Sequence, residues 1–386
     1  MVRPDGERSL SAIAWHRLRR DRKAMLGLTV ILLAIVIALF GRWFRPDGTA
    51  WADDQVLGIK DRQPGFACDI LFIPSGEPEG PSEEIPIKEW WVENGDLVVE
   101  EFNGHNDLVT GDMRRFALED VATGLSVGAS DLEMADLVKE RYVHRRNFLL
   151  GTDNFGRDVL SRLMAGTSIS LGVGLIAVLI ALVIGIPLGA IAGYFRAEAP
   201  TFRLFGRTFR WPVDDVIMWL VNVVWSVPTL LMVIAITLAL GKGFVQVFLA
   251  VGLTMWVEVA RVVRGEVVRV REMEFVEAAK ALGYSPGRII FHHILPNVMG
   301  PVIVISAANF ATAILMEAGL SFLGIGAQLP MVSWGGMIRS YYPYITTSLP
   351  HLALLPGLCI MVLTLAFMLV GNGLRDALDT RSITGR

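Results

Sequence analysis

Six apolar stretches, each close to the length needed to cross a lipid bilayer, are the strongest constraint on how this chain can fold. A helix rises about 1.5 Å per residue, so a hydrocarbon core of about 30 Å takes about 20 apolar residues to cross. The stretches occupy residues 24–41, 169–195, 216–240, 243–257, 298–316 and a part of 350–374. The fourth is expected to continue through Glu258 towards Val263. The pattern predicts an all-α polytopic membrane protein with six transmembrane helices.

The composition supports this class and isolates one polar segment. Hydrophobic residues make up 53% of the 386 and charged residues 19%, whereas about a quarter of the residues in a soluble domain are charged. Between Gly41 and Thr167 there are 13 basic and 24 acidic residues, a net charge of −11, and the rest of the chain carries +8. An acidic, polar segment therefore interrupts a basic membrane protein.

Basic residues predict which helix ends lie in the cytoplasm, because short cytoplasmic loops are enriched in Lys and Arg. Clusters of them precede the first stretch and follow the second and the fourth, at positions 17–23, 196–210 and 261–288. The other two short loops contain only Lys242 and Arg339 as basic residues. Both termini are therefore expected in the cytoplasm, and the first stretch is expected to be an uncleaved anchor rather than a signal peptide.

These assignments divide the chain into segments with different surroundings. They are a cytoplasmic N-terminal segment (1–23), a first transmembrane helix (24–41), an extracytoplasmic, periplasmic subdomain (42–147), a segment before the second helix (148–168), a membrane core with helices two to six (169–374) that includes a cytoplasmic loop (261–297), and a cytoplasmic tail (375–386).

The subdomain is expected to fold as a small external α/β insertion. Residues 85–92 and 97–102 have the pattern of two strands, joined by a turn around Asn94-Gly95, a dipeptide typical of tight hairpins. The subdomain is either an insertion without a role of its own or a surface that receives or gates a partner. In the second case Trp90 and Trp91 are candidate contacts, although adjacent aromatic residues on a strand more often put one ring in a core.

The loop at residues 261–297 is predicted to form a helix, a tight turn and a second helix. Good helix formers run up to Leu282, and Gly283 suits the left-handed conformation that ends a helix. Ser285 is expected as an N-cap with Pro286 at the first helical position, and Pro296 is expected to stop the second helix. Such an element either transmits force from a soluble motor, with small residues at 278, 279 and 283 allowing a partner to approach, or lies on the bilayer as an amphipathic helix.

The sequence lacks the common motifs of enzyme chemistry. It contains no GxxxxGK[ST] phosphate loop, no HExxH motif and no GxSxG motif. His292 and His293 have no nearby carboxylate at helical spacing, and Cys68 and Cys359 lie in a polar and an apolar segment, so neither a metal site nor a disulfide is expected. We expect a transport subunit rather than an enzyme, with no catalytic residue, cofactor or metal in this chain.

The loop at residues 261–297 carries a recognisable pattern. Glu277, Ala278 and Ala279, then Gly283, then Leu295 and Pro296 resemble the EAA signature of permeases in binding-protein-dependent ATP-binding cassette (ABC) importers. In that family the signature docks into a groove of the ATPase subunit. The resemblance therefore implies that these six residues couple this chain to an ATPase, supported by Arg261, Arg264, Ser285 and Pro286. His293 stands where the broad family favours isoleucine, a difference that the peptide and nickel importer branch tolerates. Residues 261–297 are hereafter called the EAA loop.

Further stretches resemble the C-type permease subunits of dipeptide and oligopeptide importers. They are residues 150–162 (LGTDNFGRDVLSR), 260–265 (ARVVRG), 320–324 (LSFLG) with 333–335 (SWG), and 373–379 (GLRDALD). The resemblance implies the type I ABC importer permease fold, with six transmembrane helices and the small external insertion between helices 1 and 2. Residues 46–146 show no such match.

The resemblance also implies a function and a set of partners. The chain is expected to form half of the translocation path for di- or oligopeptides in the bacterial inner membrane, as a heterodimer with a second homologous permease subunit. Two ATPase subunits are expected to bind ATP and Mg, and an extracytoplasmic binding protein to deliver the substrate; no nucleic acid is expected. The nearest alternative is an importer of nickel or another small solute. An alternative of a different class is a membrane-anchored receptor or assembly protein, for which scrambling residues 267–296 should have no effect.

Polar residues at membrane depth are candidates for the translocation path, because they are costly in hydrocarbon and usually face a cavity or a partner. The candidates are Asn222, Pro228, Asn309 and Glu317, while His351 is expected at the interface. Pro228 is expected to kink a path-lining helix and to free one carbonyl. Glu317 is expected either at an external gate or at a helix end that reaches water. For Glu258 an ion pair with Arg261 or Arg264, one turn along, is preferred.

Overall fold

The computed structural model describes residues 15–73, 83–102, 104, 111–118, 131–196, 201–204, 207–210, 212–241, 243–328 and 330–378. Two of the residues singled out above, Lys242 and Asp379, lie outside these ranges. The chain divides into two units by its internal contacts. Unit 1 comprises Met1–Leu39, Gly166–Tyr342 and Ala353–Arg386, and unit 2 comprises Phe40–Ala165 and Pro343–Leu352.

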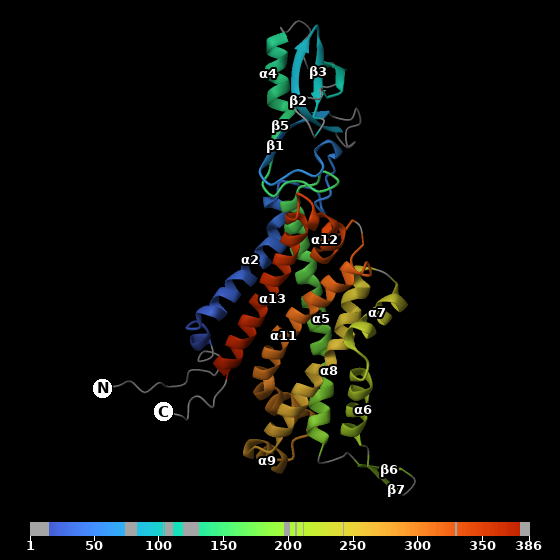
Figure 1. Cartoon of the computed structure of the whole chain (residues 1–386). Helices are drawn as coiled ribbons and strands as arrows, with labels where there is room; N and C mark the ends of the chain where they lie inside the picture. Colours follow the sequence, from blue (N-terminus) through green and yellow to red (C-terminus); the bar gives the residue numbers. More distant parts are fainter. Residues whose placement is uncertain are drawn as a thin grey trace, which may run out of the picture. The chain divides into compact units, whose positions relative to one another are not determined.

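The apolar stretches form long helices (Figure 1). These are α2 (Arg22–Phe44), α5 (Val159–Phe195), α6 (Val213–Trp225), α7 (Thr229–Leu240), α8 (Phe244–Arg271), α11 (Leu295–Phe322) and α13 (His351–Leu378). Shorter elements are α9 (Glu274–Ala281), α10 (Pro286–Arg288), η2 (Ile289–Ile294), α12 (Trp334–Tyr341), η3 (Tyr342–Thr346) and the hairpin of β6 (Thr201–Leu204) and β7 (Arg207–Arg210). Within the described residues, 5 helices are long and apolar enough to cross a membrane. The number rises to 6 if the bent pair of α6 and α7 is counted as one span. The predicted polytopic helical fold is confirmed.

The second apolar helix begins earlier than its hydropathy indicates. α5 starts at Val159, so half of the expected pre-helix segment, residues 148–168, is helical. Asp158 explains the early start, because its Oδ2 accepts a hydrogen bond from Ser161 N at 2.8 Å. A carboxylate in this position caps a helix by satisfying one of its free N–H groups. The cap lies outside the apolar run, which is why hydropathy alone misses it.

The third apolar stretch is not one kinked helix, as expected, but two helices bent by 88°. α6 ends at Trp225, and Pro228 has an extended ψ of 124° before α7 begins. Proline also disfavours the helical conformation for the residue before it, here Val227. The carbonyl of Val224, which an unbroken helix would bond to residue 228, accepts instead from Val227 N at 3.4 Å.

Within unit 1, α5 and α8 pack backbone against backbone. Three glycines of α5, spaced four apart, make this contact: Gly185, Gly189 and Gly193. A Cβ on them would lie 2.7 Å from Trp256 O, 2.4 Å from Ala260 O and 2.8 Å from Arg264 O, respectively. Small residues at this spacing let membrane helices approach closely. α8 also packs on α7 and α11, so it is the central helix of the unit 1 core.

Unit 2 contains a five-stranded antiparallel sheet in the order β4-β3-β2-β1-β5 (Figure 1). Its elements are β1 (Phe66–Ile73), β2 (Glu83–Glu93), β3 (Asp96–Glu101), β4 (Met113–Ala117), β5 (Val143–Phe148), α4 (Asp131–Arg141) and η1 (Leu57–Ile59). The predicted hairpin is confirmed: Glu93 pairs with Asp96, and Asn94 and Gly95 both have positive φ, as a type I′ turn requires.

Apolar side chains cover both faces of this sheet. One cluster joins Leu71, Ile87 and Val99 to Val138 of α4, and a second joins Ile70 and other residues to η1. The second cluster consists of Val56, Ile59, Cys68, Ile70 and Phe148. Trp90 packs on the first cluster, whereas Trp91 is 38% exposed. The insertion is therefore a folded subdomain with its own core.

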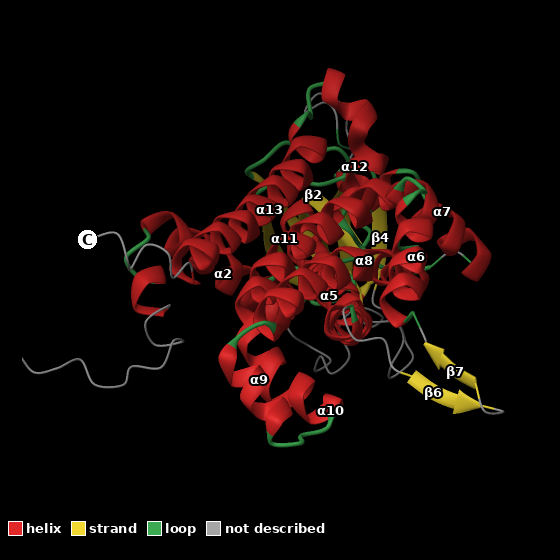
Figure 2. Cartoon of the chain, turned by 90° about the horizontal axis from the view of Figure 1, so that it is seen from below, coloured by secondary structure: helices red, strands yellow, loops and turns green. Residues whose placement is uncertain are grey.

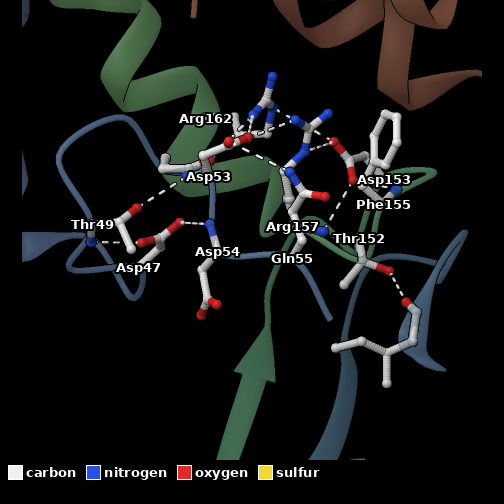
Figure 3. Close-up of polar contacts among 12 residues, drawn as sticks. Asp47, Thr49, Asp53, Asp54, Gln55, Thr152, Asp153, Phe155, Arg157 and Arg162 are labelled. Atoms are coloured by element: carbon white, nitrogen blue, oxygen red, sulfur yellow. Dashed lines mark hydrogen bonds and ion pairs between the residues drawn. The ribbon is translucent and has the colours of Figure 1, made fainter. Parts of the chain in front are cut away.

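Within unit 2, an ion-pair network joins residues 52–53 to residues 153–162 (Figure 3). Asp153 is fully buried, and its Oδ2 lies 2.8 Å from Arg157 Nε. Arg157 Nη1 also reaches Asp53 Oδ1 at 2.7 Å, and Arg162 Nη1 donates to Ala52 O at 3.2 Å. Residues 52–53, which follow α2, are thereby fixed to residues 153–162, which lead into α5.

Gly156 completes this junction. Its φ is +75°, and a Cβ would lie 1.8 Å from Val56 O, so only glycine fits. This close approach explains a glycine inside the GTDNFGRD stretch that the resemblance had singled out without a physical reason.

Replacing Asp153 by Asn is expected to destabilise unit 2 by about 3 kcal/mol, because breaking a buried ion pair leaves Arg157 partly uncompensated. Pulse proteolysis of the detergent-solubilised protein in urea measures this change. Asp136→Asn on the exposed side of α4 is the matched control, with an expected change of no more than about 0.5 kcal/mol. Equal resistance of Asp153→Asn and the wild type would contradict a structural role for the network.

The pKa of the Cys68 thiol depends on its burial in the sheet, so it can be used to test the packing there. Burial raises the pKa of its thiol from 9.0 to about 11, and since only the thiolate is nucleophilic, alkylation should be slow at neutral pH. In a Cys359→Ala background, the rate of iodoacetamide modification is expected to rise with pH about a midpoint near 11 in the folded protein and near 9 in urea. A midpoint near 9 without urea would show that the thiol is not buried in the sheet.

Candidate functional site

The EAA loop begins with a short helix that ends in a well-defined turn. Gly283 follows α9 with a φ of +76°. Tyr284 N donates to Ala279 O at 3.2 Å and Gly283 N donates to Lys280 O at 2.9 Å. This pair of bonds is a Schellman motif, which satisfies the last carbonyls of a helix. The predicted helix end at Gly283 is confirmed, and the turn is rigid because its backbone groups are bonded.

Beyond the turn, the second helix does not end at Pro296, as expected, but continues into the membrane helix α11. Ser285 is at the N-cap position with Pro286 first in α10, although the Ser285 side chain makes no capping bond. η2 then has the wider π-helical bonding, and Leu295 and Pro296 open α11. Pro296 is tolerated because the first turn of a helix needs no donor from its N–H.

The residues of the EAA pattern face in different directions. Glu277, Ala278, Gly283 and Pro296 are exposed, and Leu295 is half-buried. Ala279 is only 3% exposed and packs in the core with Val276 and Ile290. The expectation that Ala279 allows close approach of a partner is therefore wrong; its small size lets α9 pack on η2 instead. Figure 2 shows α9 and α10 at the margin of the helical unit.

Large apolar side chains on this loop were missed in the sequence. Leu282 is 71% exposed, Phe291 59% and Phe275 39%. Phe275 and Leu282 are seven residues apart, a spacing that brings two side chains to the same face of a helix. Read alone, the spacing does not distinguish a face packed on the protein's own core from an exposed one. Exposed large apolar side chains that share one face are typical of a surface that binds another protein.

The two arginines expected to support the loop are bound to α6. Arg264 Nε and Nη2 each lie 2.6 Å from a carboxylate oxygen of Asp214, and the Arg261 guanidinium lies 4.1 Å from the Trp225 ring centre. The preferred ion pair of Glu258 with Arg261 or Arg264 is therefore wrong. Asp214 competes for Arg264 from 50 residues away in the sequence, which helical spacing cannot reveal.

The other polar residues of the membrane helices fall into two groups. Asn222 and Pro228 are exposed at the α6–α7 break. Asn309 and Glu317 are each 1% exposed within the core, and Glu317 Oε1 accepts from Ser321 Oγ at 2.6 Å. The expectation that Glu317 reaches water at a helix end is wrong, because α11 continues to Phe322 and the Glu317 side chain is buried.

A cavity of about 140 Å³ lies beside the α6–α7 break. It is lined by residues of α6, α7, α8 and α11, among them Trp225, Thr229, Met255, Glu258 and Met316. Within the described residues, no group of three or more His, Cys, Asp or Glu side chains is placed to hold a metal ion. The cavity thus combines one carboxylate with aromatic and thioether surface.

Family models match both ends of the chain. The model for binding-protein-dependent transport system inner membrane components matches residues 185–384, and the model for the N-terminal transmembrane domain of oligopeptide transport permease C matches residues 9–64. Residues 65–184, which include the sheet, lie outside both matches.

Individual relatives agree with the models. The dipeptide transport system permease protein DppC of Alkalihalophilus pseudofirmus is 43% identical over 231 residues, which are 60% of this chain and 71% of the relative. The oligopeptide transport system permease protein OppC of Bacillus subtilis is 38% identical over the same shares. The glutathione transport system permease protein GsiD of Escherichia coli is 29% identical over 99% of this chain and 94% of the relative. The EAA loop lies inside the matched region that covers more than half of the sequence, and the chain therefore belongs to the family of binding-protein-dependent transport system inner membrane components, the permeases of ABC importers.

Proposed function

We propose that this chain forms half of the translocation path of a bacterial importer for di- or oligopeptides. It acts with a second homologous permease subunit, two ATPase subunits that bind ATP and Mg, and an extracytoplasmic binding protein. It lies in the inner membrane with both termini and the EAA loop in the cytoplasm. The positions of the basic residues support this orientation, since they gather in the loops assigned to the cytoplasm.

The geometry of the EAA loop carries the proposal. Val276 and Ala279 of α9 pack on Ile289, Ile290 and other residues of the same core, and the turn at Gly283 has its backbone bonds satisfied. η2 then runs into α11 without a break. A displacement of α9 by a partner is therefore transmitted to a membrane helix rather than absorbed by a flexible loop.

The exposed part of the loop supplies the docking surface. Glu277, Ala278 and Gly283 face outwards, next in sequence to the exposed Phe275 and Leu282. A charged residue among apolar ones gives both orientation and buried area to an interface. The direction of the helical segment that leads from α10 into α11 is set by Ser285, Pro286, Leu295 and Pro296. Ala279 holds α9 against η2 of this segment.

The path residues take two roles in the proposal. Asn222 and Pro228, exposed at the α6–α7 break, face the path. Asn309 and Glu317, which are buried, support it from behind by fixing α11 in the core. Arg264, held by Asp214, and Arg261, on Trp225, anchor the end of α8 to α6.

Peptides are the proposed substrate because the relatives that match this chain are named as dipeptide, oligopeptide and glutathione permeases. Nickel and other small solutes remain the competing class, and a receptor or assembly protein the competing function.

Replacing Glu277 by Lys is expected to reduce the ATPase activity stimulated by loaded binding protein by about tenfold or more, because it reverses a charge at the centre of the docking surface and such contacts are worth about 2 kcal/mol or more. The assembled transporter in proteoliposomes is the assay. Asp376→Lys, exposed near the end of α13, is the matched charge reversal and should leave the activity within about twofold. Full stimulation in Glu277→Lys would contradict docking by this loop.

The substrate class is tested in the same proteoliposomes with the wild-type complex. ATP hydrolysis is expected to rise several-fold when the binding protein is loaded with a tripeptide and to stay at the basal rate with nickel complexes. Stimulation by nickel alone would replace peptide by metal, and stimulation by neither, with the EAA loop dispensable, would favour the receptor alternative.

A further inference from the structure

Glu258 is a charged residue in the fourth apolar helix, three residues before the start of the EAA loop. It is residue 15 of the 28 in α8, about 21 Å along the helix from Phe244. Its neighbours Val257 and Val259 are buried in the core of unit 1, whereas Glu258 itself is exposed. The Glu258 side chain therefore lies at the edge of the packed core and not inside it.

The two arginines nearest to it in sequence have other partners. Arg264 holds Asp214 through two bonds of 2.6 Å, and Arg261 lies on the Trp225 ring. Within the described part of the chain, no Lys, Arg or His nitrogen lies within 4.0 Å of the Glu258 carboxylate.

Acidic residues within membrane helices are rare, and they usually face a bundle interior or a water-filled cavity. Glu258 lines the cavity of about 140 Å³ beside the α6–α7 break. The carboxylate thus faces a concave surface formed by this chain.

The other walls of the cavity suit a cation with a variable apolar neighbour. Trp225 supplies an aromatic ring that already carries the Arg261 guanidinium. Met232, Met255 and Met316 supply thioethers, which adapt to side chains of different shape. The volume is smaller than the 300 Å³ or more that is usual for a pocket holding a whole ligand, so it fits one end of a longer molecule.

We propose that Glu258 binds the amino-terminal ammonium group of the peptide as it passes through the membrane, with the methionines around the first side chain. This rests on the proposed function, since it assigns a contact within the same path. A single charged anchor at a group that all unmodified peptides share, surrounded by adaptable side chains, explains how a path recognises peptides without reading their sequence.

The test compares Glu258→Gln, Glu258→Asp and the control Asp376→Asn in complete transporters with radiolabelled trialanine and its binding protein. The number of ATP molecules hydrolysed per peptide imported is expected to rise about tenfold in Glu258→Gln, because peptides are released but not captured. Glu258→Asp, which keeps the charge, should recover most of the coupling, and Asp376→Asn should match the wild type. A purely structural role would not separate hydrolysis from import.

Two results would overturn the inference. One is a wild-type coupling ratio in Glu258→Gln. The other is loss of the second permease subunit on copurification of Glu258→Gln, which would show that the carboxylate pairs with the partner and not with the peptide. The proposed function stands in both cases, since it fails only if loaded binding protein does not stimulate the wild-type ATPase.

Discussion

The backbone contact between α5 and α8 is the constraint on which unit 1 depends. Gly185, Gly189 and Gly193 bring the two helices so close that a Cβ on any of them would collide with a carbonyl oxygen of α8. Close packing of this kind replaces the hydrophobic driving force that helices lack in lipid. It fixes α8 in the core, and α8 in turn holds Glu258 against the cavity and Arg264 against Asp214.

The packing of α5 on α8 also positions the EAA loop, because α8 leads into it. α8 runs directly towards α9, α9 packs on η2, and η2 is continuous with α11. The buried Ala279 and the bonded turn at Gly283 leave little freedom between these elements. The residues that resemble a docking signature thus also have an internal role. Ala279 is buried in the core and Gly283 forms the turn, whereas Glu277 and Ala278 face outwards.

The sequence predicted those features that depend on neighbouring residues. The apolar stretches, the Asn94-Gly95 hairpin and the end of α9 at Gly283 follow from local hydropathy and backbone preference. Features that depend on distant contacts were missed. Arg264 binds Asp214 rather than Glu258, Ala279 is covered by η2, and Glu317 is enclosed by α11 and its neighbours. The effect of proline was the hardest to predict. Pro228 lies at an 88° bend between two helices, whereas Pro296 lies in the first turn of α11 and does not interrupt the helical segment.

The central claim is that α9, η2 and α11 move as one body. Spin labels at Ala281, which is exposed at the end of α9, and at Ile303, which is 46% exposed on α11, measure it most directly by electron paramagnetic resonance in the assembled transporter. The account predicts one narrow distance distribution that is the same without nucleotide and with bound ATP. A distribution that broadens, or that shifts by several ångströms on ATP binding, would contradict it.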